Sequence, residues 1–269
     1  MAVAAPAEED RKAHKARTIV VDVVLHERRE RVFLVLAGFF LCAMTLLNVI
    51  GITRFIQLGP LQLAVGVLPY PLTFLCTDLI SELYGRRRAN FVVWVGFYLN
   101  FFILGCLWLG NALPPVAPES QPPWQVIEVA EQLALPNGQT LSGQIELFHL
   151  IYACTSGAVF ASMMAYIAAQ FCDVQLFHFF KRLTRGRHLW LRNNFSTLTS
   201  QLVDSVMVIT VTFGAAFLAG TITLVGLMHL VASNYVFKMV VALADTLPFY
   251  YLTGRLKRSL EIDNLHVLD

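Results

Sequence analysis

The sequence predicts an all-α integral membrane protein, a bundle of six transmembrane helices with both termini in the cytoplasm. Composition is the first reason: 57% of the 269 residues are hydrophobic and only 14% are charged. Several apolar runs also approach the ~20 residues that cross a hydrocarbon core of ~30 Å. The basic residues occupy alternate connections between these runs, which indicates an even number of spans.

Apolar windows give the position of each span. The predicted spans cover residues 32–53, 61–83, 90–111, 147–171, 195–219 and 226–253. Eighteen of the 20 Lys and Arg residues fall before the first span or after the second, fourth and sixth. The opposite connections contain one basic residue, Arg54. The positive-inside rule therefore places both termini in the cytoplasm.

These spans divide the chain into three parts. We expect a cytoplasmic N-terminal segment over 1–30, a transmembrane domain over 31–258 with an external loop over 112–146, and a cytoplasmic tail over 259–269. The external loop contains four glutamates and neither Lys nor Arg. Its stretch WQVIEVAEQLA is compatible with a small surface helix.

The second predicted span combines two prolines with two carboxylates, in PYPLTFLCTDLISELYGRRR. Asp78 and Glu82 are four residues apart and share one helix face. The prolines interrupt helical hydrogen bonding, which membranes tolerate only against protein or a water-filled cavity. We therefore expect Leu68–Pro71 to form a cavity wall, with Tyr70 and Phe74 as stacking residues. Alternatively, the prolines only kink a packed helix, both rings belong to the core, and Glu82 pairs with the basic cluster.

Lys238 lies inside the apolar stretch VASNYVFKMVVALAD. An ammonium near the middle of a bilayer costs at least ~3 kcal/mol, so it persists where it pairs, lines a cavity or contacts a substrate. Asp204 lies ~14 Å into the fifth span and Lys238 ~17 Å into the sixth from the other side. Adjacent antiparallel helices could bring the two charges into contact, either in a substrate site or in a structural ion pair that fixes helix register.

Further polar residues extend this pattern along the spans. Gln201 shares a helix face with Asp204, while Asn234 and Asp245 share roughly the face of Lys238. Together these residues would form a polar seam that faces the interior of the bundle. Asn48, in the first span, could join this seam or bond another helix. The fourth span carries small residues at every fourth position, which predicts close packing inside the bundle or across a homodimer: Gly157, Ala161, Ala165 and Ala169.

Catalytic and metal-binding motifs are absent from the sequence. HERRE at 26–30 lacks the second histidine of a zinc protease, and neither GxSxG nor a phosphate-binding loop occurs. None of the five cysteines forms a CxxC pair or a cluster with metal-ligand spacing. We therefore expect no enzyme activity, no metal and no cofactor.

Three blocks of the sequence resemble, in order, those of the queuosine precursor transporter family, inner-membrane proteins formerly grouped as vitamin-uptake-like. The blocks are GVLPYPLTFLCTDLISELYGRRRAN, then ASMMAYIAAQFCDVQLFHFFKRLTRGRHLWLRNNFSTLTSQLVDS, then YVFKMVVALADTLPFYYL. The resemblance covers roughly residues 31–258. It implies a multi-pass protein of the bacterial inner membrane that imports 7-cyano-7-deazaguanine or 7-aminomethyl-7-deazaguanine for tRNA queuosine synthesis.

The substrate class that the resemblance implies suits the polar residues of the spans. A carboxylate can accept from N1–H and the 2-amino group of a guanine-like edge, and its carbonyl needs a donor. The expected partners are this base and the lipid bilayer, with no nucleic acid. The candidate binding residues, at a midplane site, are Asp78, Asp204, Lys238, Asn234, Gln201, Asp245, Glu82, Tyr70, Phe74 and Asn48.

Two other functions remain open at this point. The chain could be the substrate-capture subunit of an ATP-driven uptake complex, or a structural membrane subunit whose polar seam only holds helices together. Energy for a carrier could come from a proton, from metabolic trapping of the base or from a partner.

Overall fold

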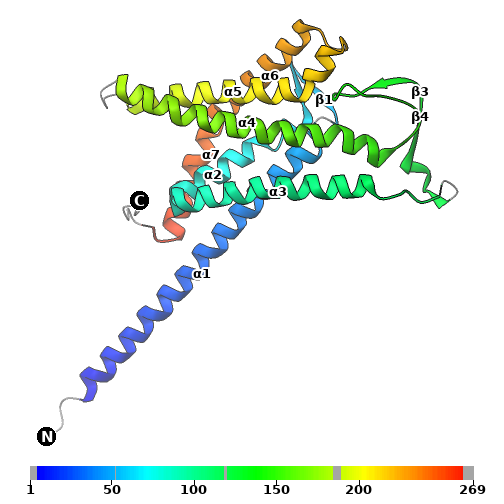
Figure 1. Cartoon of the computed structure of the whole chain (residues 1–269). Coiled ribbons are helices and arrows are strands. Elements are labelled where there is room, and N and C mark those ends of the chain that lie inside the picture. The colour runs from blue at the N-terminus through cyan, green and yellow to red at the C-terminus, as the bar shows by residue number, and fades with distance from the viewer. Residues whose placement is uncertain (1–4, 52, 118–119, 184–188, 263–269) are drawn as a thin grey trace.

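Helices make up most of the chain, and two short β-hairpins lie at the end of the bundle away from the C-terminus (Figure 1). The computed structural model describes residues 5–51, 53–117, 120–183 and 189–262, with the backbone alone over 5–21 and 170–197 and at 86, 167 and 200. In chain order the elements are α1 (Ala5–Val49), β1 (Phe55–Leu58), β2 (Leu61–Ala64), the 3-10 helix η1 (Val65–Val67), α2 (Tyr70–Tyr84), α3 (Arg86–Ala112), the 3-10 helix η3 (Pro123–Gln125), β3 (Val126–Ala134), β4 (Thr140–Glu146), α4 (Leu147–Leu183), α5 (Leu189–Leu218), α6 (Leu224–Ala244) and α7 (Thr246–Ser259).

Five described stretches of helix are long and apolar enough to cross a bilayer. They are Asp22–Val49, Arg87–Ala112, Leu147–Tyr166, Gln201–Leu218 and Leu224–Ser259, the last of which joins α6 and α7. Each overlaps one predicted span. Many large apolar side chains on these helices point outward, including Leu34, Phe91 and Phe102, which are 65–71% exposed. Such a surface fits a lipid environment.

The second predicted span, 61–83, differs from the expectation of a continuous helix. Its first residues form strand β2, which pairs with β1 through the two-residue turn Gly59–Pro60, where Gly59 has φ 58°. The helix α2 begins only at Tyr70, and its 15 residues rise about 22 Å, less than the ~30 Å of a hydrocarbon core. Six spanning helices are therefore not confirmed.

The two prolines explain where α2 begins. Pro69 is the N-cap of α2 and Pro71 lies in its first turn. Proline is tolerated there, because the first backbone N–H groups of a helix have no partner inside the helix. The predicted break at Leu68–Pro71 exists, but it is a helix start and not a kink within a helix.

The external loop contains a second hairpin. WQVIEVAEQLA does not form a surface helix: β3 pairs with β4 in antiparallel register from Val126 with Glu146 to Ala134 with Thr140. The turn uses LPNG, in which Gly138 has φ 82° and Leu135 N–H bonds Gln139 O at 2.8 Å. The expectation of an all-α chain thus holds for the helical bundle, to which two small sheets are added.

The sixth predicted span consists of two helices. α6 ends at Ala244 and α7 begins at Thr246, with Asp245 between them. Pro248 explains the break, because a proline cannot donate the hydrogen bond that the carbonyl of Ala244 would accept in a continuous helix.

One end of the bundle is held by polar contacts between α1, the α2–α3 junction and α7. Arg29 donates to the carbonyl oxygen of Leu260 at 3.0 and 3.1 Å, and Tyr84 donates to the carbonyl oxygen of Arg29 at 2.8 Å. Lys257 forms an ion pair with Glu82. Arg29 of the first predicted basic cluster therefore lies at the same end of the bundle as the clusters after the second and sixth predicted spans. The side chains of the cluster after the fourth span, at 181–192, lie outside the described residues.

Replacing Arg29 by Gln is expected to lower the free energy of unfolding by about 1–2 kcal/mol, because its charged hydrogen bonds to the end of α7 are lost. Thermal unfolding in detergent measures this change. The matched control is Arg31→Gln, since Arg31 pairs with Glu27 along the exposed surface of α1, and such exposed pairs contribute little. Equal stability of the two variants would contradict the proposed role of Arg29.

Helix α4 packs along α5, and two members of the predicted small-residue ladder lie in the interior. Ala161 and Ala165 are fully buried within the chain, whereas Gly157 is exposed. Close packing inside the bundle is therefore confirmed for these two alanines. A homodimer through this face stays a prediction.

Candidate functional site

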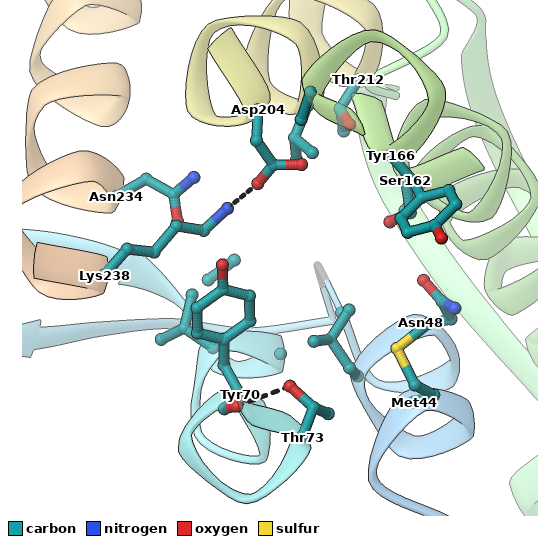
Figure 2. Close-up of a pocket in the computed structure, with 18 of the residues that line it drawn as sticks. Met44, Asn48, Tyr70, Thr73, Ser162, Tyr166, Asp204, Thr212, Asn234 and Lys238 are labelled. Atoms are coloured by element: carbon teal, nitrogen blue, oxygen red, sulfur yellow. Dashed lines mark hydrogen bonds and ion pairs between the residues drawn. The ribbon is translucent and has the colours of Figure 1, made fainter. Parts of the chain in front are cut away.

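A cavity of about 470 Å³ lies between helices α1 to α6, with the β1–β2 hairpin and η1 forming part of its wall. This volume is within the range of about 300–1,000 Å³ that small-molecule sites occupy. Most lining side chains are apolar, among them Met44, Val93, Met163 and Ile209. Two groups of polar side chains lie on opposite sides of the cavity, and further polar residues, among them Thr73 and Thr212, also line it (Figure 2).

The buried ion pair between Lys238 of α6 and Asp204 of α5 belongs to the first group. Their side chains are 6% and 19% exposed, so both charges are largely removed from solvent. The contact predicted from their depths in antiparallel helices is confirmed. Pairing also explains how an ammonium is tolerated at this position in an apolar helix.

Tyr70, Gln201 and Asn234 surround this ion pair. The Nζ of Lys238 lies 4.8 Å from the ring centroid of Tyr70, close enough for a cation–π contact. The hydroxyl of Tyr70 donates to Oε1 of Gln201 at 2.8 Å. Asn234, one turn before Lys238, also lines the cavity. We call these five residues, Tyr70, Gln201, Asp204, Asn234 and Lys238, the ion-pair wall.

Phe74 and Asn48 also line the cavity. Phe74 packs edge-to-face against Tyr70, with ring centroids 4.6 Å apart. Asn48 of α1 donates from Nδ2 to Oδ1 of Asn100 of α3 at 2.8 Å, so its predicted bond to another helix is confirmed. Asn48, Ser162 and Tyr166 lie across the cavity from Asp204 and Lys238 (Figure 2). We call Asn48, Asn100, Ser162 and Tyr166 the amide wall.

Three predicted site residues lie outside this cavity lining. Glu82 pairs with Lys257 at the end of the bundle, as the alternative interpretation of Glu82 expected. Asp78 is exposed on α2. Asp245 lies at the break between α6 and α7, where its Oδ2 is buried without a hydrogen-bond partner among the described residues. The structure therefore separates these carboxylates from Asp204.

Sequence reasoning missed Asn100, Ser162 and Tyr166. Asn100 is one of three amides within the apolar third span, with Asn90 and Asn111, so the rule that selected Asn48 would have found it together with these two. Ser162 and Tyr166 are four residues apart and share a face of α4. Nothing in the sequence distinguishes their hydroxyls from those of other membrane helices.

The side chains of this cavity suit a small, planar and polar ligand. Among the described residues, no group of three His, Cys, Asp or Glu side chains could hold a metal ion. The ion-pair wall offers one carboxylate acceptor beside ammonium and amide donors, with no net charge from the pair. A ligand that presents adjacent donors and an acceptor along one edge would match this arrangement.

Comparisons with known proteins agree with this description. A family model described as "Putative vitamin uptake transporter" matches residues 64–253. A "Probable queuosine precursor transporter" from Bacillus subtilis (strain 168) is 27% identical over 210 residues, which cover 76% of this chain and 77% of the relative. No solved structure matches the chain significantly.

The family match spans most of the bundle and includes every element from η1 to α6. It confirms the resemblance inferred from the three sequence blocks. The chain therefore belongs to the family described as "Putative vitamin uptake transporter" and is a multi-pass transporter of the bacterial inner membrane, not an enzyme.

Proposed function

We propose that this transporter imports the queuosine precursors 7-cyano-7-deazaguanine and 7-aminomethyl-7-deazaguanine through the cavity. The observation that carries the proposal is the buried Asp204–Lys238 ion pair on the cavity wall. The name of the Bacillus subtilis relative supports the substrate class.

The chemistry of the base matches the ion-pair wall. The six-membered ring presents a carbonyl acceptor, the N1–H donor and the 2-amino donor in a row. Asp204 can accept from the two adjacent donors, and Lys238 can donate to the carbonyl. Since each charge already has a partner, the base adds hydrogen bonds without leaving either ion unpaired.

The aromatic pair Tyr70–Phe74 lies beside the same wall. A heterocycle held by Asp204 would have one of these rings as an apolar neighbour, and aromatic contacts contribute about 0.5–1.5 kcal/mol beyond burial. Asp78, Glu82 and Asp245 would then act outside the binding step. A proton-driven carrier would have Asp78 and Asp245 available for proton uptake.

We infer that the segment from β1 to α2 completes a sixth crossing, so that both ends of the bundle domain lie in the cytoplasm. The contact of Arg29 with the carbonyl of Leu260 supports this topology, because it places the start of the first span beside the end of the last. An even number of crossings follows. The basic clusters at this end indicate that it is the cytoplasmic end.

The β1–β2 hairpin would then cover the external end of the cavity. The backbone N–H of Gln62 donates to Oγ of Ser233 at 3.3 Å, and Phe55 contacts Phe213 with ring centroids 5.9 Å apart. These few contacts could be exchanged when the site opens to the outside. The contacts of Arg29 and Lys257 would hold the opposite end, as alternating access around a midplane site requires.

The purified transporter is expected to bind both deazaguanines saturably and to bind adenine at least about 100-fold more weakly. Adenine lacks the N1–H and 2-amino donors, so the carboxylate of Asp204 would lose both hydrogen bonds. Ligand-induced thermal shifts in detergent measure the affinities, and unsubstituted 7-deazaguanine tests the contribution of the 7-substituent.

Uptake by the purified chain in liposomes separates the remaining alternatives. Transport without any other protein would exclude a pure substrate-capture subunit of an ATP-driven complex. Saturable binding without transport would indicate that the chain is the substrate-capture subunit of such a complex. Failure to bind any of the bases would contradict the proposed function and favour a structural membrane subunit.

A further inference from the structure

We propose that Asn48 of the amide wall accepts a hydrogen bond from the N9–H of the deazaguanine's five-membered ring. This contact would restrict the site to free bases and exclude their nucleosides. This inference rests on the proposed function and adds to it a determinant of specificity on the second wall. The N9–H is common to both precursors and is replaced by the ribose in a nucleoside.

The first observation is an unpaired acceptor. Asn48 is 1% exposed, and no donor among the described residues lies within hydrogen-bond distance of its Oδ1. A buried amide oxygen without a partner is costly, so such atoms in folded proteins usually meet a ligand or a water molecule. Asn48 also lines the cavity.

Asn100 fixes the orientation of this amide. Nδ2 of Asn48 donates to Oδ1 of Asn100 at 2.8 Å, and Asn100 is itself 4% exposed. This bond uses one N–H of the Asn48 amide, while its oxygen has no donor among the described residues and is the acceptor left for a ligand. The unpaired oxygen at this position favours a ligand with a donor, such as a ring N–H.

The two walls are arranged to hold opposite edges of one base. Figure 2 shows Asn48 across the cavity from Asp204 and Lys238. When Asp204 accepts from N1–H and the 2-amino group, N9–H points away from it, toward the amide wall. Met44 lies beside Asn48, and its flexible thioether can move aside to admit the ring.

Burial at Asn48 explains why a nucleoside would be rejected. A ribose on N9 would remove the donor and place a bulky polar group against a side chain that is 1% exposed. Both effects act at the same position, and losing a matched hydrogen bond there leaves the amide oxygen unpaired.

Binding of 7-cyano-7-deazaguanine and of its 9-methyl derivative to the full-length transporter tests this inference. Wild type is expected to bind the parent base at least about 10-fold more tightly than the 9-methyl base. Asn48→Leu is expected to weaken binding of the parent by a similar factor and to change binding of the 9-methyl base much less. If Asn48→Leu unfolds, Asn48→Leu combined with Asn100→Leu replaces both partners and gives the same comparison.

Asn111→Leu is the matched control, because Asn111 also bonds a neighbouring helix, through His149 at 2.8 Å, but does not line the cavity. It should leave both affinities unchanged. Equal binding of the two bases by wild type would overturn this inference and leave the proposed function intact. An equal loss for both bases in Asn48→Leu would also overturn it. If wild type bound neither base, the proposed function itself would fail.

Discussion

The double variant Lys238→Met, Asp204→Leu is expected to lose deazaguanine binding by at least about 100-fold while keeping its fold. The buried pair is replaced by apolar side chains of similar size, an exchange that is often neutral or stabilising. The same exchange removes the carboxylate and the ammonium that would hold the base. Ligand-induced thermal shift and uptake into liposomes measure the loss.

Lys238→Met alone should behave differently. It leaves the carboxylate of Asp204 unpaired in a largely buried position, which costs about 3–5 kcal/mol of stability. The matched control is Lys257→Met with Glu82→Leu, which removes the ion pair that is 35% and 44% exposed at the end of the bundle and should leave binding unchanged. Full binding by the Lys238→Met, Asp204→Leu variant would show that the buried pair only joins helices.

Replacing Gly66 by Ala is expected to lower the free energy of unfolding by about 1–3 kcal/mol and to reduce uptake. A Cβ at this position would lie 2.7 Å from Cα of Gly51 and 2.7 Å from the carbonyl oxygen of Leu47. Both obstacles are backbone atoms, so no side chain can rotate away. Because Gly51 and Gly66 line the cavity, separating them would also displace its wall.

Gly105→Ala is the control for this variant. A Cβ at Gly105 would meet nothing within 4 Å, and the residue lies inside α3, where alanine is the better helix former. Thermal unfolding should therefore show no loss. A Gly66→Ala variant as stable and as active as wild type would contradict the close contact between η1 and the end of α1.

Much of the bundle could be predicted from apolar run length and charge. Five of the six predicted spans correspond to helices, because crossing a bilayer demands a long apolar helix whatever its neighbours are. The segment 61–83 did not follow this rule. Apolar residues of this segment pack against other parts of the chain instead of facing lipid; Leu63, for example, is only 1% exposed. The segment can therefore form a hairpin and a short helix.

The candidate site was partly predictable for the same reason. Lys238 and Asp204 stand out because an ionised group is costly in an apolar helix, and each needs a partner at matching depth. Asp78, Glu82 and Asp245 carry the same signal. Their separation from the cavity depends on how α2 and α7 pack. The rotation of each helix about its own axis, which decides the side that its carboxylates face, cannot be predicted from a single sequence.

The sequence by itself determined that this chain is a helical membrane protein with buried charges and one strongly basic side. Those properties follow from the lipid surroundings, since the hydrocarbon core excludes charges and backbone groups that have no partner, whatever the rest of the fold is. Only the tertiary structure decided which polar residues share the cavity. Asn48 meets Asn100 across 52 positions of the chain, and Tyr70 meets Gln201 across 131. These contacts arise from the packing of helices far apart in sequence, which local pattern does not encode.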